Sequence, residues 1–268
     1  WLSSFEKLSK YIDPEFKKDM WQVGIEGPNL IDERIKKYNI KCDIQWGYVH
    51  TAIHKGHMRD LEEYQKTFEA HGYPKLRALE NKSFLFNYVR SDAYIGGLYD
   101  AGSGHLHPLK YLIGISNAAA NTGVKIYTKS RICSIETANN KNKLITKEGH
   151  VIRSEHLIIC GNAYLGSIAP QQMHRRLAQV TSSVMATEPL SDSEIKALIP
   201  SKAAIADGNT ALNYFRIDKQ KRMIFGGRAS YLNRDPINVE ADLKKRMKAV
   251  FPNLSNKKIL QTWSGRIG

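Results

Sequence analysis

The chain has 268 residues, of which 42% are hydrophobic and 25% charged, and its formal net charge is +14. This composition is typical of a globular protein and excludes a disordered or fibrous chain. No apolar run approaches the ~18 residues of a membrane-spanning helix, and no charged-then-apolar leader is present, so we expect neither an anchor nor a signal peptide. Because Trp1 rather than Met stands first, we expect the start of the protein to lie further upstream.

The excess of Lys and Arg is compatible with binding to a phosphate backbone. The basic residues are scattered, however, and the densest groups, at 34–37, 219–222 and 244–246, are short and flank apolar periodic segments. Such groups usually form the solvated faces of helices and turns. We therefore do not expect nucleic acid to be the main partner.

The three cysteines, Cys42, Cys133 and Cys160, are too few and too widely spaced for a disulfide framework or a Cys-x-x-Cys metal site. Two of them lie in apolar runs, where a thiol commonly acts as a small hydrophobic side chain. This usage indicates a reducing, cytoplasmic compartment.

The first third of the chain alternates helix and strand. Residues 3–6 fit a helix-capping box, and apolar spacing predicts a helix over 29–38 with Pro28 near its start. We expect a strand over 42–53 and a helix over 60–71 that ends at Gly72.

The middle of the chain is typical of the later part of a nucleotide-binding α/β domain. We expect a strand over 94–99, a turn over 100–104, and a helix that opens at Pro108 and stops at 121–123. Alternation then predicts the strands 124–128, 131–136 and 144–146. The apolar run 156–160 predicts a strand buried on both faces, and ligands gather beyond such strands.

The last third is different in character. The segments 178–187, 210–217 and 222–228 predict an antiparallel sheet, followed by a helix over 239–250 and a last strand at 259–263. No linker rich in Pro or Ser separates the regions. We therefore expect a mixed α/β fold, with α+β character, whose two regions interweave in one body.

Several short motifs suit a binding site. His105 and His107 have a spacing that a metal uses, although a turn histidine and a helix-capping histidine explain them better, and we expect no metal site. The Gly161–Tyr164 segment is either a tight turn or a place where a flat ligand approaches the backbone. Tyr214 to Arg216, with Phe225 to Arg228 a hairpin away, forms either an aromatic wall with arginines or an ordinary strand pair.

Taken together, these stretches resemble the D-amino-acid-oxidase-like flavin family, most closely its gamma-glutamylputrescine oxidase branch. The resemblance covers nearly all 268 residues. Its most specific strings are Gly-His-Leu-His-Pro-Leu at 104–109 and Gly-Asn-Ala-Tyr-Leu-Gly at 161–166, with further matches at 35–38, 42–43, 131–135, 214–216, 225–227 and 263–265.

The resemblance implies a FAD-dependent enzyme that oxidises a C–N bond of a small-molecule amine by hydride transfer to the flavin, followed by hydrolysis of the imine. It implies a partial Rossmann-like FAD-binding domain at 1–40 and 107–172, interleaved with an antiparallel-sheet substrate domain at 41–106 and 173–268. The residues it assigns to the cofactor are Ile132, Gly161, Asn162 and Tyr164. Those it assigns to the substrate are Tyr214, Arg216, Phe225 and Arg228. No residue is assigned as the catalytic acid or base.

Three features depart from the family pattern. The amino-terminal glycine fingerprint and the carboxyl-terminal segment that completes the flavin site do not occur in these residues, and Gly47-Tyr48 stands where the branch has paired glycines. Backbone N–H groups of that fingerprint hold the cofactor phosphates. We therefore expect this stretch alone to bind FAD weakly or not at all, and to be inactive by itself. Recovery of stoichiometric flavin would contradict this expectation.

Three interpretations stay open. The chain is either a catalytic part of such an enzyme or a non-catalytic remnant that keeps the fold and binds an acidic partner through its positive charge. A basic nucleic-acid-binding protein is the third reading, and it requires an affinity that falls steeply with salt.

Overall fold

The computed structural model describes residues 8–138, 141–168, 176, 178–231 and 237–267. It contains an eight-stranded sheet in the order β11-β7-β10-β9-β8-β1-β3-β2 and a three-stranded sheet in the order β4-β5-β6. Within the described residues β1 and β8 pair in parallel, and the other strand pairs are antiparallel. The predicted mixed α/β fold is thereby confirmed.

The strands of the large sheet come from two separate parts of the chain, 45–105 and 180–267. The strands of the small sheet lie between these parts, at 132–154. Their bounds are β1 Gln45–Ala52, β2 Leu76–Leu79, β3 Gly96–His105, β4 Ile132–Ala138, β5 Lys141–Thr146, β6 Val151–Ser154, β7 Val180–Pro189, β8 Ala204–Asp207, β9 Tyr214–Ile217, β10 Arg222–Ser230 and β11 Ile259–Ile267.

Helices occupy the segments between these strands. Their bounds are η1 Pro14–Phe16, α2 Lys17–Lys37, α3 Lys55–Ala70, α4 Lys82–Leu85, α5 Pro108–Asn121, η2 Asn162–Tyr164, η3 Gly166–Ile168, α7 Asp192–Leu198, α8 Val239–Val250 and η4 Pro252–Leu254. In the part of the chain that the structure covers, no helix combines the length and the apolarity needed to cross a bilayer.

The hydrophobic core lies between one face of the large sheet and the helices α7 and α8. Phe215 of β9 and Phe225 of β10 stack with parallel rings 5.5 Å apart, and Phe251 meets Phe215 edge-on at 5.1 Å. Leu243 and Met247 of α8 are fully buried against them. We call this side of the sheet the core face and the other side the open face.

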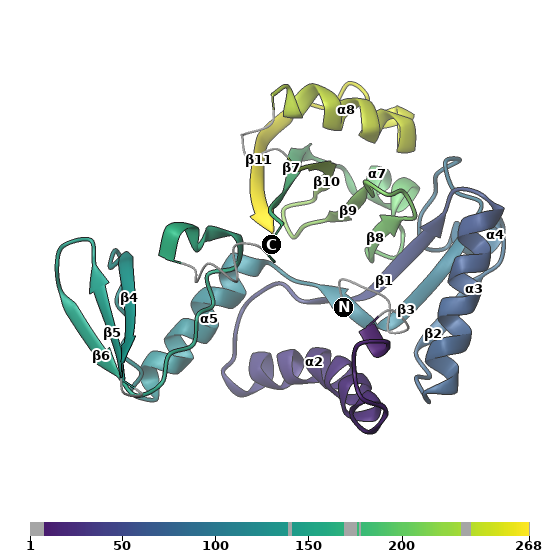
Figure 1. The fold of residues 1–268 in the computed structure, drawn as a ribbon. Helices are drawn as coiled ribbons and strands as arrows, with labels where there is room; N and C mark the ends of the chain where they lie inside the picture. The colour runs from purple at the N-terminus through teal and green to yellow at the C-terminus, as the bar shows by residue number, and fades with distance from the viewer. Residues whose placement is uncertain (1–7, 139–140, 169–175, 177, 232–236, 268) are drawn as a thin grey trace.

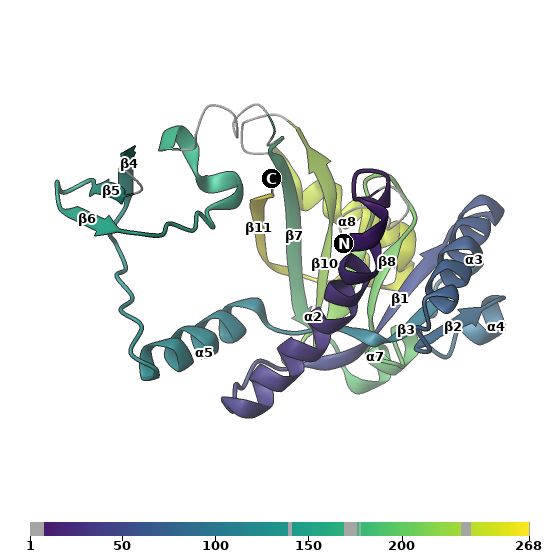
Figure 2. The same cartoon turned by 60° about the horizontal axis from the view of Figure 1, so that its bottom comes forward.

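The small sheet stands apart from this body. Figures 1 and 2 show α5 leading away from the large sheet to β4–β5–β6, whereas α8 and α2 lie on opposite faces of the large sheet. The small sheet lies within the range 107–172, and the strands of the large sheet lie within 41–106 and 173–268. The assignment of these ranges to two domains stays a prediction.

Many predicted elements are confirmed, including the strands at β1, β4, β5, β7 and β10 and the helices α3 and α8. Helix α5 begins at Pro108 as predicted, and the His107 side chain accepts a hydrogen bond from the Lys110 amide at its first turn. The capping box predicted at 3–6 lies outside the described residues. The structure instead has a capping box at Ser191 and Glu194, which opens α7.

Predictions about local structure are wrong at four segments of the chain. The helix predicted over 29–38 begins at Lys17, with Pro28 in its interior. A proline inside a helix removes one hydrogen bond and crowds the carbonyl four residues earlier. The buried Trp21, packed edge-on against Phe68 of α3 at 4.7 Å, anchors the extra turns.

The turn predicted over 100–104 is the second half of strand β3. Tyr48 pairs with Asp100 and Trp46 pairs with Gly104, so β3 accommodates extra residues in a bulge. The Asp100 carboxylate accepts the Gly102 amide at 2.8 Å inside this bulge. Small and turn-forming residues therefore serve an irregular strand here.

The strands predicted over 124–128 and 156–160 do not form. Both segments lack a neighbouring strand among the described residues, and a strand needs such a neighbour to satisfy its backbone. The prediction that 156–160 is buried on both faces is also wrong, because Ile158 is 85% exposed.

We predict that Phe225→Ala lowers the free energy of unfolding by about 3–5 kcal/mol, because it removes a fully buried ring from the core. Urea denaturation measures this change. Tyr11→Ala removes a ring that is 89% exposed and should stay within about 0.5 kcal/mol of the parent protein. Equal effects of the two substitutions would contradict the placement of Phe225 in the core.

Candidate functional site

Strand β9 sends alternate side chains to opposite faces of the large sheet. Phe215 and Ile217 are buried in the core, whereas Tyr214 and Arg216 are half-buried on the open face. Successive residues of a strand point to opposite sides, so this division follows from the register. The structure therefore brings Tyr214 and Arg216 together, as two candidate substrate residues on one face.

Tyr214 extends across the neighbouring strand. Gly226 of β10 is its partner in the register, and the Tyr214 hydroxyl lies 2.9 Å from the Ser182 hydroxyl of β7, one strand further on. A Cβ atom at Gly226 would lie 2.1 Å from the Tyr214 ring. The glycine is thus the reason that the ring can lie flat over β10. Burial raises the pKa of Tyr214 and the Ser182 hydrogen bond lowers it, with a net rise.

The other two candidate substrate residues are placed differently. Phe225 pairs with Phe215 and shares its orientation, so its ring lies in the core on the side away from Tyr214. The backbone of Arg228 lies in β10, but its side chain is outside the described part of the structure.

The predicted cofactor residues Gly161, Asn162 and Tyr164 form a short 3-10 turn with its cap. Asn162 has a φ of +46° and its side-chain oxygen accepts the Ala163 amide at 2.6 Å, which stabilises the turn. Tyr164 is 66% exposed, and its hydroxyl accepts the backbone N–H of Arg266 in β11 at 2.8 Å. This contact attaches η2 to the edge of the large sheet.

The two tyrosines approach the same row of the open face. Gly265 of β11 pairs with Ser182 of β7, and a Cβ atom on Gly265 would lie 3.8 Å from the Tyr164 hydroxyl. Ser182 is also the partner of Tyr214. The hydroxyls of Tyr164 and Tyr214 therefore lie over neighbouring strands, β11 and β7. Sequence patterns alone did not identify Ser182 or Gly265, because their role depends on pairing between distant strands.

Ile132 is not part of this group. It opens β4 in the small sheet, where it pairs with Thr146, and β4 packs against η3. The structure thus connects Ile132 with the segment that follows η2, but not with Tyr214.

The surface at η2 suits a flat aromatic group. The exposed ring of Tyr164 provides apolar area beside β11, whereas the Leu165 side chain covers Gly161, since a Cβ atom there would lie 2.4 Å from it. The aromatic surface of Tyr164 suits the edge of a flavin ring. The residues of this turn supply no cluster of backbone N–H groups for the cofactor phosphates.

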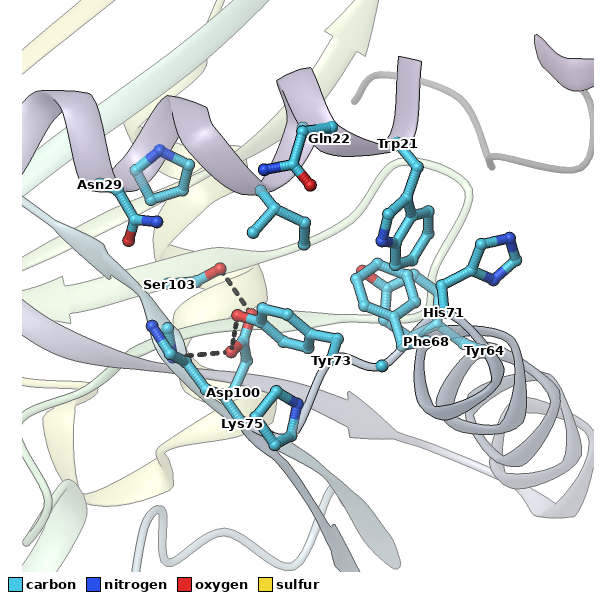
Figure 3. Close-up of a pocket in the computed structure, with 16 residues that line it drawn as sticks. Trp21, Gln22, Asn29, Tyr64, Phe68, His71, Tyr73, Lys75, Asp100 and Ser103 are labelled. Atoms are coloured by element: carbon cyan, nitrogen blue, oxygen red, sulfur yellow. Dashed lines mark hydrogen bonds between the residues drawn. The ribbon is translucent and has the colours of Figure 1, made fainter. Parts of the chain in front are cut away.

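A hollow of about 420 Å³ lies between α2, α3 and strand β3, as Figure 3 shows. At its base the buried Asp100 accepts hydrogen bonds from Tyr73 at 2.7 Å and Ser103 at 2.6 Å. Burial is the largest cause that raises the pKa of Tyr73, and the hydrogen bond to the negatively charged Asp100 raises it further. Burial together with nearby Asp100 and Tyr48 raises the pKa of Tyr64 to about 12. The local sequence around Asp100 predicts a turn and does not indicate this hollow, whose wall comes from distant segments of the chain.

His105 and His107 do not share a metal site. His107 caps α5, and His105 contacts Arg216 and the Lys202 carbonyl. No group of three or more metal-ligating side chains occurs in the residues that the structure describes.

Comparison with known proteins identifies a family. The family model of FAD-dependent oxidoreductases known as DAO matches residues 4–268. The chain is 35% identical to the probable oxidoreductase OrdL of Haemophilus influenzae, over 98% of this chain and 60% of that protein. It is 33% identical to gamma-glutamylputrescine oxidoreductase of Escherichia coli, over 90% of this chain and 56% of that protein. The chain thus spans 60% or less of these relatives.

Solved structures show the same fold at low identity. Glycine oxidase from Geobacillus kaustophilus superposes with a TM-score of 0.73 at 16% identity, over 96% of this chain and 68% of that one. L-proline dehydrogenase from P. horikoshii gives a TM-score of 0.74 at 15% identity, over 90% of this chain and 65% of that one.

We predict that Gly226→Ala destabilises the protein by about 1–3 kcal/mol, because the added methyl group overlaps the Tyr214 ring. Thermal or urea unfolding measures the change. Gly265→Ala is the matched control, since that residue also lies in a strand of the large sheet and a Cβ atom there would meet nothing closer than 3.8 Å. That control should keep or raise stability. A neutral Gly226→Ala would show that the ring does not lie over β10.

Proposed function

Because the chain belongs to the DAO family of FAD-dependent oxidoreductases, we propose that it forms part of an enzyme that oxidises a C–N bond of a small amine. Bound FAD would supply the acceptor for a hydride from the carbon beside the nitrogen. The nitrogen would lose a proton, and water would convert the imine of a primary amine to an aldehyde and ammonia.

The observation that supports this proposal is the convergence of Tyr164 and Tyr214 on one row of the open face. We assign Gly161, Asn162 and Tyr164 to the border of the flavin ring, and Ile132 to the adenine end through its backbone. Tyr214 then lies where a substrate would cover the ring, and its half-buried position excludes water from that side. The chain's own residues would orient the substrate rather than react with it.

Arg216 points to the class of amine. It lies two residues from Tyr214 on the same strand, about 6.6 Å along the strand direction. A guanidinium at this distance suits a carboxylate at the far end of an amine substrate. We propose a gamma-glutamylated diamine as the substrate, in line with the name of the Escherichia coli relative. Arg228 is a second candidate for the same carboxylate.

The remaining proposals concern the environment of the protein. Cys133 and Cys160 are free and exposed, and Cys42 is free and buried, which supports a reducing cytoplasmic compartment. A non-catalytic binding module is the alternative function, and nucleic-acid binding is a further one, because of the +14 charge. Salt-sensitive binding to DNA or RNA, without any amine oxidation, would favour the last of these.

The oxidase proposal is tested with the chain and whatever its coding sequence adds on either side. The purified protein is supplied with FAD and a panel of amines, and peroxide and aldehyde are measured. We expect the aldehyde from a gamma-glutamylated diamine, and peroxide because dissolved O2 takes the two electrons of the reduced flavin with two protons to give H2O2. A flavin-containing protein that oxidises none of the amines would overturn the proposal.

For the active protein we predict that Arg216→Ala raises KM for the carboxylate-bearing amine at least about tenfold and changes kcat much less, because the lost contact serves binding. Steady-state kinetics measure both constants. Arg77→Ala, an exposed arginine of β2 in the same sheet, is the control and should leave KM unchanged. An unchanged KM in Arg216→Ala would exclude Arg216 as the anchor.

A further inference from the structure

Another hollow, of about 380 Å³, lies where β3 and β9 end and β1 begins. It is open to solvent and has both acidic and basic side chains in its wall. The charged and titratable residues that line it are Asp43, His105, Asp192, Lys202, Arg216, Asp218, Lys219 and Lys221.

Arg216 is the half-buried cation of this hollow. Its Nη1 lies 3.3 Å from Nδ1 of His105. Within the described residues it has no ion pair with a carboxylate at 4.0 Å or less. Burial lowers the pKa of Arg216, and Asp218 and Asp43 oppose that change from a greater distance. A cation withdrawn from water without a paired anion is costly, so a bound anion would relieve this site.

The carboxylates in the wall do not form an ion pair with Arg216, because each already has another cationic partner. The pairs are Asp218 with Arg222 at 2.7 Å, Asp192 with Lys221 at 2.8 Å, and Asp43 with Lys110 at 2.6 Å and Lys219 at 3.4 Å. The guanidinium has five N–H donors in a planar fork that matches a carboxylate. With one donor directed to His105, the others are left for a ligand.

His105 determines how the guanidinium is held. Its Nε2 lies 3.1 Å from the Lys202 carbonyl oxygen, which can only accept a hydrogen bond. Nε2 therefore carries the proton, and Nδ1 presents its lone pair to Arg216. The ring is neutral in this arrangement. Burial is the largest cause that lowers the pKa of His105, and the Arg216 charge adds to it against the Lys202 hydrogen bond.

We propose that this hollow is a binding site for a small carboxylate. Arg216 would bind the carboxylate, and His105 would position the guanidinium. Lys202 adds a positive charge to the wall, whereas Lys219 and Lys221 are paired with Asp43 and Asp192. That this carboxylate is the acid end of the amine substrate rests on the proposed function. The binding of a small carboxylate at this hollow does not depend on the proposed function.

Protonation of His105 would break this arrangement. A charged ring carries N–H on both nitrogens, so Nδ1 could no longer accept from Arg216 and would place a like charge 3.3 Å from it. Anion affinity should therefore be complete above the pKa of His105 and fall as the pH drops through it. Because that pKa lies below the ordinary value for histidine, the fall is expected on the acidic side of neutrality.

The test is titration of the protein with glutarate at constant ionic strength, followed by calorimetry, with the neutral isostere glutaramide as the comparison. We expect glutarate to bind and glutaramide not to bind. Arg216→Ala should weaken glutarate binding at least about tenfold, and His105→Ala about fivefold or more. His150→Gln, an exposed histidine on the turn before β6, should bind as the parent does.

The role of His105 is tested by the pH profile. His105→Gln keeps a donor and an acceptor but does not titrate, so it should retain the affinity for glutarate at neutral pH. Protonation of glutarate itself lowers the affinity of both proteins at acidic pH. The parent protein should show an additional loss of affinity that His105→Gln lacks. Equal binding of glutarate and glutaramide would overturn the site. Identical pH profiles for the parent and His105→Gln would overturn the role of His105. Since neither measurement uses FAD or an amine, failure of the oxidase proposal would be seen separately.

Discussion

The alternation of side chains along β9 is the constraint on which the rest of the site depends. Phe215 and Ile217 are buried against α8 and its neighbours, and this burial determines which way Tyr214 and Arg216 point. A shift of one residue in the pairing with β10 would exchange the two sets. The stacked rings of Phe215 and Phe225 oppose such a shift, because both would have to leave the core together. Packing on one face thus specifies the chemistry of the other.

The open face is assembled from segments that are far apart in the sequence. Tyr164, Ser182, Tyr214 and Gly265 come from four elements. Tyr164 accepts the Arg266 amide next to Gly265, Gly265 pairs with Ser182, and the Ser182 hydroxyl bonds to that of Tyr214. Small residues make this possible, since Gly226 leaves room for the Tyr214 ring and Gly265 lies beneath the Tyr164 hydroxyl. The amine-oxidase proposal uses this row, whereas the carboxylate proposal uses the other end of β9. One short strand would therefore serve both ends of a single substrate.

Local patterns predicted much of this molecule. Alternation identified most strands of the large sheet, and His107-Pro108 identified the start of α5, because these signals depend on neighbours in sequence. Tyr214 and Arg216 could be grouped from their spacing alone. Phe225 could not be separated from them, because only the β9–β10 register reveals that it faces the core. The prediction of a buried strand over 156–160 is wrong for a related reason. Burial of a strand depends on neighbouring strands, and its own residues do not specify them.

The edge of the large sheet at β11 has a further property. A strand at an edge presents unpaired N–H groups that invite a strand from another molecule. At Arg266 that N–H is already taken by the Tyr164 hydroxyl, and η2 lies against the strand at this point. The contact that brings the proposed flavin border to the sheet therefore also blocks the edge at Arg266 against strand addition and aggregation.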